Sequence, residues 1–328
     1  MRRIPPALFL FFLAPAIGEL LSGSAPPVEF FNPFTLLILS ALYGSGAVLA
    51  RELALRWNKR WPTILTLGLA YGIIEEGLMV KSFFDSNWMD LGILGTYGRL
   101  AGVNWVWSVS LTLYHATVSI AIPILLTELI YPDRRDESWI GRRGMIGLSI
   151  LLAAVGLFGA LALAPYRPPF VPYLFTVIAT VGLFFLARQM PQCFASRKKN
   201  PRGRPFWIGM IGFLATVAFF IAGWALPELG LPPVLTIGFL IVLALVVLRL
   251  LRWASGEGAW SDIGRLAPVS GALTFFILLA FIAESSTDRT ENPAGMAFVG
   301  LTAAAGLLAL NLRVRRGARE EKRVGMIG

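Results

Sequence analysis

The chain has 328 residues, of which 56% are hydrophobic and 15% are charged. This composition excludes an ordinary soluble domain and is typical of an integral membrane protein. The net charge of +10 is spread over many short segments, so it does not indicate a nucleic-acid site, which needs a concentrated basic patch. A single cysteine excludes an intrachain disulfide and a thiolate cluster for metal.

Apolar stretches follow one another along the whole chain, separated by short charged or Pro/Gly breaks. A membrane-spanning helix needs roughly 20 predominantly apolar residues. On this basis we predict spans at 7–22, 33–56, 61–80, 104–130, 144–164, 170–188, 206–226, 231–252, 268–284 and 292–312. The predicted fold class is all-α, a polytopic bundle of about ten spans, with residues 1–328 forming a single integral membrane domain.

The basic residues predict how the bundle is oriented in the cell membrane. If the N-terminus is cytoplasmic, all lysines and arginines fall on the cytoplasmic side except Lys81, Arg99, Arg167 and Arg289. This asymmetry follows the positive-inside rule and places both termini in the cytoplasm. The expected partner is the lipid bilayer, and anionic inner-leaflet lipids are expected against the basic stretches 197–204 and 313–323.

Polar residues at membrane depth are concentrated in the first four predicted spans. We therefore expect residues 1–130 to supply the helices of a polar site and residues 131–328 to supply packing helices. Among the latter, Gly156, Gly159, Gly209 and Gly212 are expected to permit close approach of neighbouring helices. The outer loop 81–103, rich in aromatic residues, either covers a site or lies at the membrane interface.

The third predicted span contains two adjacent carboxylates, Glu75 and Glu76, in an otherwise apolar helix. Each acidic residue near the bilayer centre costs about 2.5–3.5 kcal/mol, so the pair indicates a function. At about 100° per residue, both acids share a helix face with Gly68 and Gly72. Glycines allow a neighbouring helix to approach closely, so the acids are expected to point into the bundle.

The fourth predicted span carries a matching polar stripe formed by Asn104, Ser108, Thr112, His115 and Ser119. These residues occupy one helix face about 80° wide. His115 is the only histidine in the chain, and histidine is the side chain whose unperturbed pKa lies near neutrality. The stripe therefore presents a proton-transfer group that could face the glutamate pair, although a buried histidine can also serve only in packing.

The glutamate pair and His115 can meet only if they lie at similar depths in the membrane. With a rise of about 1.5 Å per residue, Glu76 lies about 8 Å and His115 about 16 Å below the outer membrane boundary. The predicted gap is thus about 8 Å, which helix tilt can close. Glu19 falls in the outer third by the same count and is expected to join the site or to end its helix near water.

Two carboxylates beside a histidine can perform more than one kind of chemistry. They can activate a water for attack on a carbonyl, with one glutamate as base and His115 orienting the water or stabilising an oxyanion. They can equally bind and release a transported proton. One histidine and two adjacent glutamates lack the further ligand of a conventional zinc site, so we expect no metal and no cofactor.

Glu75-Glu76 in one predicted span and His115 in the next resemble two motifs of the CPBP family of intramembrane glutamate proteases, EExxxR and FxxxH. Val80 stands at the arginine position, with Lys81 next, and Leu111 stands at the phenylalanine position. The family's third motif needs a second histidine, which this chain lacks. The resemblance implies a glutamate-activated water that cleaves a peptide bond within the membrane.

Three hypotheses follow for the function: an intramembrane hydrolase, a proton-coupled transporter of small molecules or lipids, and a membrane scaffold whose buried polar residues only pack. The hydrolase is placed first because it is the hypothesis that a sequence motif supports. Its expected catalytic residues are Glu75, Glu76 and His115. The residues expected to contact a substrate are Tyr71, Asn104, Ser108, Thr112, Ser119 and Glu19.

Overall fold

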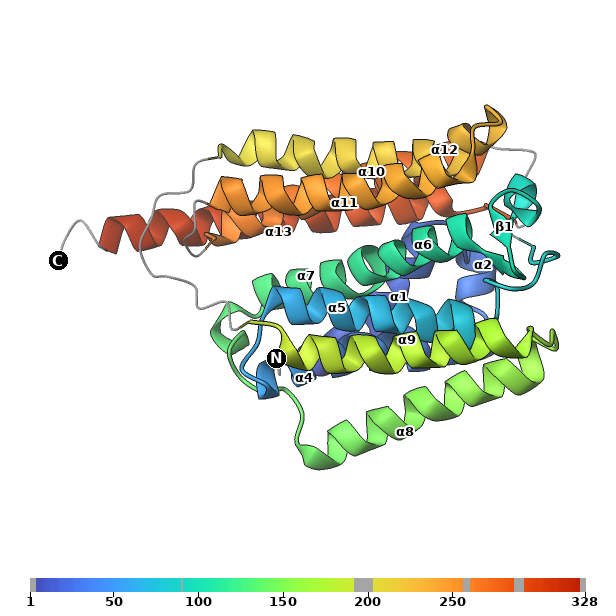
Figure 1. Ribbon diagram of the computed structural model, residues 1–328. Coiled ribbons are helices and arrows are strands. Elements are labelled where there is room, and N and C mark those ends of the chain that lie inside the picture. Colours follow the sequence, from blue (N-terminus) through green and yellow to red (C-terminus); the bar gives the residue numbers. More distant parts are fainter. Residues whose placement is uncertain (1–3, 90, 192–202, 256–259, 286–291, 325–328) are drawn as a thin grey trace.

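The computed structural model describes residues 4–89, 91–191, 203–255, 260–285 and 292–324. The described chain is a bundle of long helices with one small two-stranded hairpin in the loop between the third and fourth of them (Figure 1). The predicted all-α membrane bundle is confirmed, since eight of the described helices are long and apolar enough to cross a membrane. The shorter apolar helix Pro6–Leu21 and the helix 61–79, which contains the glutamate pair, lie at the positions of the other two predicted spans.

The helices are interrupted by π-helical turns, labelled η1, η2, η3, η5 and η7. All of these except η7 lie in the first half of the chain. The elements of residues 4–134 are α1 (Pro6–Pro15), η1 (Ala16–Leu21), α2 (Pro27–Phe30), α3 (Pro33–Leu39), η2 (Ser40–Gly44), α4 (Ser45–Arg56), α5 (Trp61–Gly72), η3 (Ile73–Met79), the 3₁₀ turn η4 (Gly92–Gly95), β1 (Arg99–Leu100), β2 (Val103–Asn104), α6 (Trp105–Tyr114), η5 (His115–Ala121), α7 (Ile122–Ile130) and the 3₁₀ turn η6 (Pro132–Arg134). Strands β1 and β2 pair antiparallel, with Arg99 opposite Asn104.

The second half consists of longer and more regular helices. They are α8 (Arg142–Phe158), η7 (Gly159–Leu163), α9 (Phe170–Gln189), α10 (Pro205–Glu228), α11 (Pro233–Ser255), α12 (Asp262–Ser285) and α13 (Met296–Val324). The basic stretch predicted at 197–204 lies outside the described residues up to position 202, whereas α13 carries exposed arginines at its C-terminal end.

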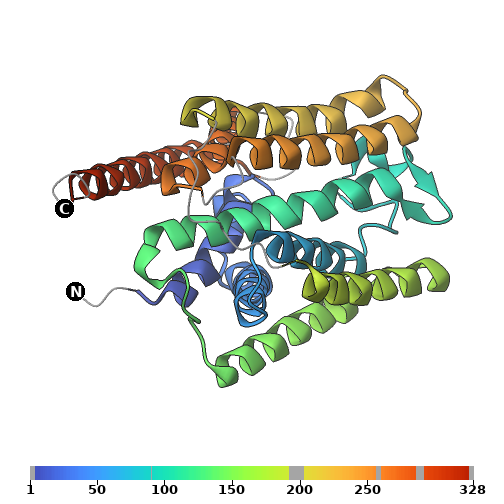
Figure 2. The same cartoon turned by 60° about the vertical axis from the view of Figure 1, so that its left-hand side comes forward.

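The helices run roughly parallel to one axis in two groups (Figure 1). Helices α10 to α13 form one layer, and α12 packs both on α10 and on α13. This layer meets the first group where α11 contacts α6 and α12 contacts α7, while α8 and α9 lie on the far side of the first group (Figure 1). Helix α1 begins and α13 ends on the same side of the bundle (Figure 2), as an even number of crossings requires.

The outward surface of the helices is apolar. Leu161, Phe170 and Val234 are among the large hydrophobic side chains that remain mostly exposed. In water such a continuous apolar surface would be unfavourable, whereas in a bilayer it faces acyl chains at no cost. Helices α8, α9, α10 and α11 carry most of this surface, so they form the lipid-facing perimeter around a buried first group.

Glycines set the closest helix contacts, as predicted for three of the four named positions. A Cβ placed on Gly212 would lie 2.0 Å from the Pro268 carbonyl oxygen, and one on Gly159 would lie 2.4 Å from the Met79 side chain. Gly209 approaches Ala267 less closely, at 3.4 Å. The prediction for Gly156 is wrong, because that position of α8 faces open space, where a small residue brings no neighbour closer.

Candidate functional site

Four of the five π-helical turns in the described residues carry the polar side chains of the candidate site. Glu19 lies on η1, Tyr43 on η2, the glutamate pair on η3 and His115 on η5. A π turn inserts an extra residue into an α-helix and redirects the side chains around it, and such turns occur frequently at functional sites. Turns η1 and η5 contact each other, and α5 contacts η5. The polar residues therefore gather where the irregular turns meet.

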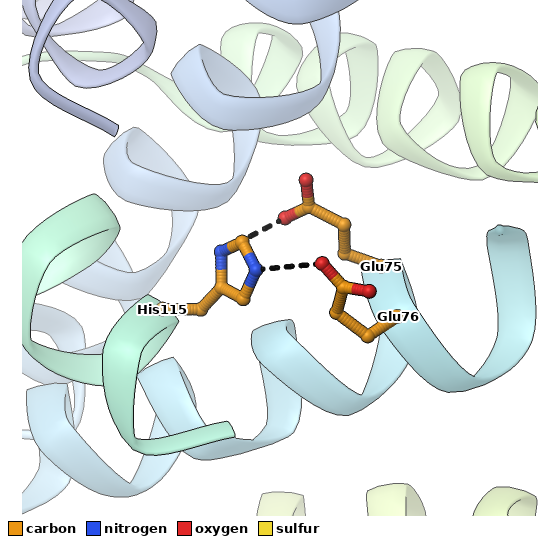
Figure 3. A group of neighbouring side chains, drawn as sticks. All are labelled: Glu75, Glu76 and His115. Atoms are coloured by element: carbon orange, nitrogen blue, oxygen red, sulfur yellow. Dashed lines mark hydrogen bonds and ion pairs between the residues drawn. The ribbon is translucent and has the colours of Figure 1, made fainter. Parts of the chain in front are cut away.

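His115 faces both glutamates from the neighbouring helix (Figure 3). Its Nε2 atom is 3.0 Å from Glu76 Oε1, and its Nδ1 atom is 3.2 Å from Glu75 Oε2. His115 is 2% exposed, and both carboxylates are buried as well. The two acids that neighbour each other in sequence thus contact opposite nitrogens of one imidazole, in surroundings where charge interactions are strong because water is excluded.

The contact between Glu76 and His115 corrects the predicted separation of about 8 Å, which assumed ideal helices. The turns η3 and η5 replace regular α-helical geometry in both helices at this level. Glycines also bring the two backbones together, because a Cβ on Gly68 would lie 2.7 Å from the Cα of Ala116. The expectation that the glycine face of the third span points to the fourth is met.

Four further side chains surround the imidazole. Ser119 Oγ lies 3.0 Å from His115 Nδ1, one turn further along the same helix. The rings of Tyr43, Tyr71 and Tyr114 are centred 5.9, 6.0 and 5.5 Å from that of His115. Tyr71 and Ser119, both predicted from the sequence, therefore lie beside the histidine.

Glu19 reaches the cluster through Tyr43, whose hydroxyl donates a hydrogen bond to Glu19 Oε1. Gly18 makes this possible, since a Cβ there would lie 2.7 Å from the Tyr43 ring. A third carboxylate from α1 and η1 thus borders the Glu75–Glu76–His115 cluster. Glu19 is partly exposed, so it marks an edge of the cluster and not its centre.

The loop that follows η3 closes the other side of the cluster. Ser82 Oγ donates a hydrogen bond to Glu76 Oε2 and accepts one from Trp107 Nε1 at 3.0 Å. Phe83 and Phe84 are buried against α6 and α9 at the start of the loop. The first residues of the loop 81–103 therefore cover the site, which is one of the two predicted alternatives. Further along the loop, Leu100 is mostly exposed.

Three members of the predicted polar stripe lie outside the cluster. Asn104 caps α6, with its Oδ1 accepting from the Trp107 backbone N–H at 2.9 Å. Ser108 Oγ donates to the Asn104 carbonyl at 2.6 Å. Thr112 packs with its backbone beside Gly72 and is only partly buried. Asn104 therefore pairs with one N–H of the first turn of α6, whose N–H groups have no partners within the helix, and the Ser108 hydroxyl is satisfied by the carbonyl of the same residue.

Tyr43, Ser82 and Trp107 were not predicted as site residues. Tyr43 lies in an apolar helix where a lone tyrosine gives no polar stripe, but glycines frame it, and a Cβ on Gly46 would lie 2.3 Å from the Tyr71 ring. The sequence signal that could have indicated Tyr43 as a site residue is its position beside small residues in an otherwise apolar helix. Ser82 and Trp107 come together only because the chain reverses after η3, which sequence spacing does not reveal.

These observations define the class of protein: a polytopic membrane protein with a Glu–Glu–His cluster buried among its helices. Residues 8–321 match the family described as "Uncharacterized membrane protein family", so the chain belongs to that family. The CPBP family gives no match, so the resemblance seen at Glu75, Glu76 and His115 is not confirmed. No curated protein and no solved structure matches the chain.

Proposed function

We propose that the protein is an intramembrane hydrolase whose reaction centre is Glu75, Glu76 and His115. The observation that supports this is the contact of both carboxylates with the two nitrogens of one buried imidazole, at 3.2 and 3.0 Å. Carboxylate and imidazole are the side chains that most often transfer protons in hydrolysis. Holding them in contact before the substrate binds lowers the cost of reaching the reactive geometry.

In the proposed reaction, Glu76 removes a proton from a water that attacks a substrate carbonyl. Ser82 holds the other oxygen of this carboxylate through its hydrogen bond. His115 orients the water, and the proton passes from Glu76 Oε1 to His115 Nε2, 3.0 Å away, and from there to the leaving group. The Tyr71 hydroxyl, which lies beside Glu75, would donate to the oxyanion. Tyr71, Ser119 and Glu19 are the proposed substrate-side residues.

The substrate is proposed to reach the cluster from one side only. Toward the end of the bundle where α4 ends, the cluster is backed by buried apolar side chains, including Ile64, Leu67 and Ile124. A hollow of about 380 Å³ lies beside the end of η3, lined by Val80, Asp85 and Trp88, among others, and none of its lining residues belongs to the cluster. The proposed route therefore passes Ser82, which covers Glu76.

The test is a hydrolysis screen in proteoliposomes with lipid esters, lipid amides and transmembrane peptides as substrates. We expect one substrate class to be cleaved by the wild-type chain and cleavage to fall about 100-fold or more with His115→Asn, because the proton-transfer group is lost. Proton uptake coupled to solute movement, with no cleavage of any of these substrates, would instead favour the transporter. Cleavage unchanged in His115→Asn would overturn the proposed centre.

A further inference from the structure

The cluster contains more carboxyl groups than the surrounding protein pairs with cations. Among the described residues, neither Glu75 nor Glu76 forms an ion pair with a lysine or an arginine, and His115 is the one ion-pair partner of both. Glu19 adds a third carboxylate nearby. Buried carboxylates without a cation are costly, so they are held neutral by protons or compensated by a bound positive ion.

Two buried polar atoms of the cluster also lack hydrogen-bond partners. Glu75 Oε2 lies 3.2 Å from His115 Nδ1, but that nitrogen forms its hydrogen bond with Ser119 at 3.0 Å. Within the described residues, neither Glu75 Oε2 nor the Tyr71 hydroxyl has a partner in hydrogen-bond geometry, although these two side chains lie close enough to interact with each other. Both side chains are more than nine-tenths buried. Buried polar atoms are rarely left unpaired, so they point to a species that the protein itself does not supply.

The donor atoms are of the types and spacing that suit a divalent cation. One nitrogen or oxygen from each of Glu75, Glu76 and His115 lies within 4.8 Å of the others. Three protein ligands plus an open position for water are the usual arrangement of a catalytic zinc site, with bonds of about 2.0–2.2 Å to nitrogen and oxygen. Such bonds place two ligands roughly 3.3 Å apart, close to the 3.0 Å between His115 Nε2 and Glu76 Oε1.

Ser119 supplies the orientation that a metal-binding histidine needs. In the tautomer that donates Nδ1–H to Ser119, the lone pair of His115 Nε2 points toward Glu76 Oε1. Two atoms that both carry lone pairs are held 3.0 Å apart only with a proton or a cation between or beside them. Metal-binding histidines commonly donate their other N–H to such a partner, which fixes the tautomer and the ring.

We propose that Glu75, Glu76 and His115 bind one divalent transition-metal cation such as Zn²⁺ or Mn²⁺, with Ser119 as the residue that orients His115. The sequence alone suggested no metal because it offers one histidine and no thiolate, but the structure brings three donors together. The inference names a cofactor for the centre of the proposed hydrolase and in that sense rests on it. A bound cation would polarise the substrate carbonyl and acidify the attacking water, with Glu76 and His115 then serving as its ligands in place of base and proton carrier.

The test measures metal content directly, on the full-length chain without an affinity tag. The wild-type protein in detergent is stripped with a chelator, incubated with ZnCl₂ or MnCl₂, desalted and analysed by mass spectrometry. We expect about one equivalent of metal per chain. Glu75→Gln and His115→Asn are expected to bind at least about 10-fold more weakly, and Ser119→Ala about 10-fold more weakly through loss of orientation.

Glu284→Gln is the matched control, because Glu284 accepts hydrogen bonds from the Gly295 and Ala297 backbone and takes no part in the cluster. Elution as a single species in size-exclusion chromatography shows that each variant is folded. A wild-type content below about 0.1 equivalents, or wild-type binding by Glu75→Gln, would overturn the site. Hydrolysis by metal-free protein would contradict the proposed metal cofactor but not the proposed hydrolase. Metal binding without hydrolysis of any substrate would support the metal site and contradict the proposed hydrolase.

Discussion

Replacing Glu76 with glutamine is expected to reduce hydrolysis by about 10²–10⁴-fold while the fold is retained. Glutamine has nearly the same shape, so its amide oxygen can still accept the hydrogen bond from Ser82 and its amide nitrogen can face His115 Nε2. What the substitution removes is the basic oxygen that takes the proton from water. The rate is measured in proteoliposomes on the substrate that the wild-type chain cleaves.

Glu284→Gln serves as the control for the Glu76→Gln variant. It makes the same chemical change in a glutamate that caps the start of α13 through backbone N–H groups, so it should leave the rate within about twofold of wild type. Retention of more than half of the wild-type rate by Glu76→Gln would exclude this residue as the base. An equal loss in both variants would mean that hydrolysis depends on general stability.

Replacing Arg51 with methionine is expected to lower the free energy of unfolding by about 3–5 kcal/mol. Arg51 is 2% exposed, and its guanidinium donates to Glu52 Oε1 at 2.6 Å and lies 3.6 Å from Glu128 Oε1. It also donates to the Arg135 and Glu137 carbonyls. Methionine can fill the volume, but it leaves the buried Glu128 without its ion-pair partner and Glu52 with only Arg56, at 3.8 Å. Unfolding in mixed detergent micelles measures the difference.

Arg134→Met is the matched control at the same end of the bundle. Arg134 is about half exposed and pairs with Glu137, which is also exposed, at 3.2 Å. Exposed pairs of this kind contribute about 0–1 kcal/mol, so the control should unfold nearly as wild type does. If Arg51→Met and Arg134→Met have equal effects, the buried network does not hold the 131–141 loop on α4.

The long helices could be predicted closely because hydrophobic length alone decides them. The expected span 170–188 corresponds to Phe170–Gln189, and 33–56 corresponds to the continuous helix formed by α3, η2 and α4. Every backbone polar group in a bilayer must be bonded within its own helix, so an apolar stretch of sufficient length has one available structure. Most ends shifted by a few residues, but α12 begins at Asp262 where 268 was predicted, and α13 continues to Val324 where 312 was predicted.

The candidate site could be predicted only in part. Glu75, Glu76 and His115 stand out because charge and imidazole are costly at membrane depth. Helical spacing places the two acids on a glycine face and His115 on a polar stripe. Their contact could not be derived, because the turns η3 and η5 result from tertiary packing and have no clear local signal. The sequence likewise predicted one continuous stripe from Asn104 to Ser119. In the structure, Asn104 caps the N-terminus of α6 by accepting a hydrogen bond from the Trp107 backbone N–H.

A double-mutant cycle between Glu76 and His115 tests most directly whether they act as one centre. The hydrolysis rates of wild type, Glu76→Gln, His115→Asn and the double variant are compared in the same proteoliposomes. Because Nε2 and Oε1 are 3.0 Å apart, we expect the double variant to lose little more than either single variant, since residues that act as a unit are strongly non-additive. Losses that multiply would show that the two side chains act independently and would contradict the proposed centre.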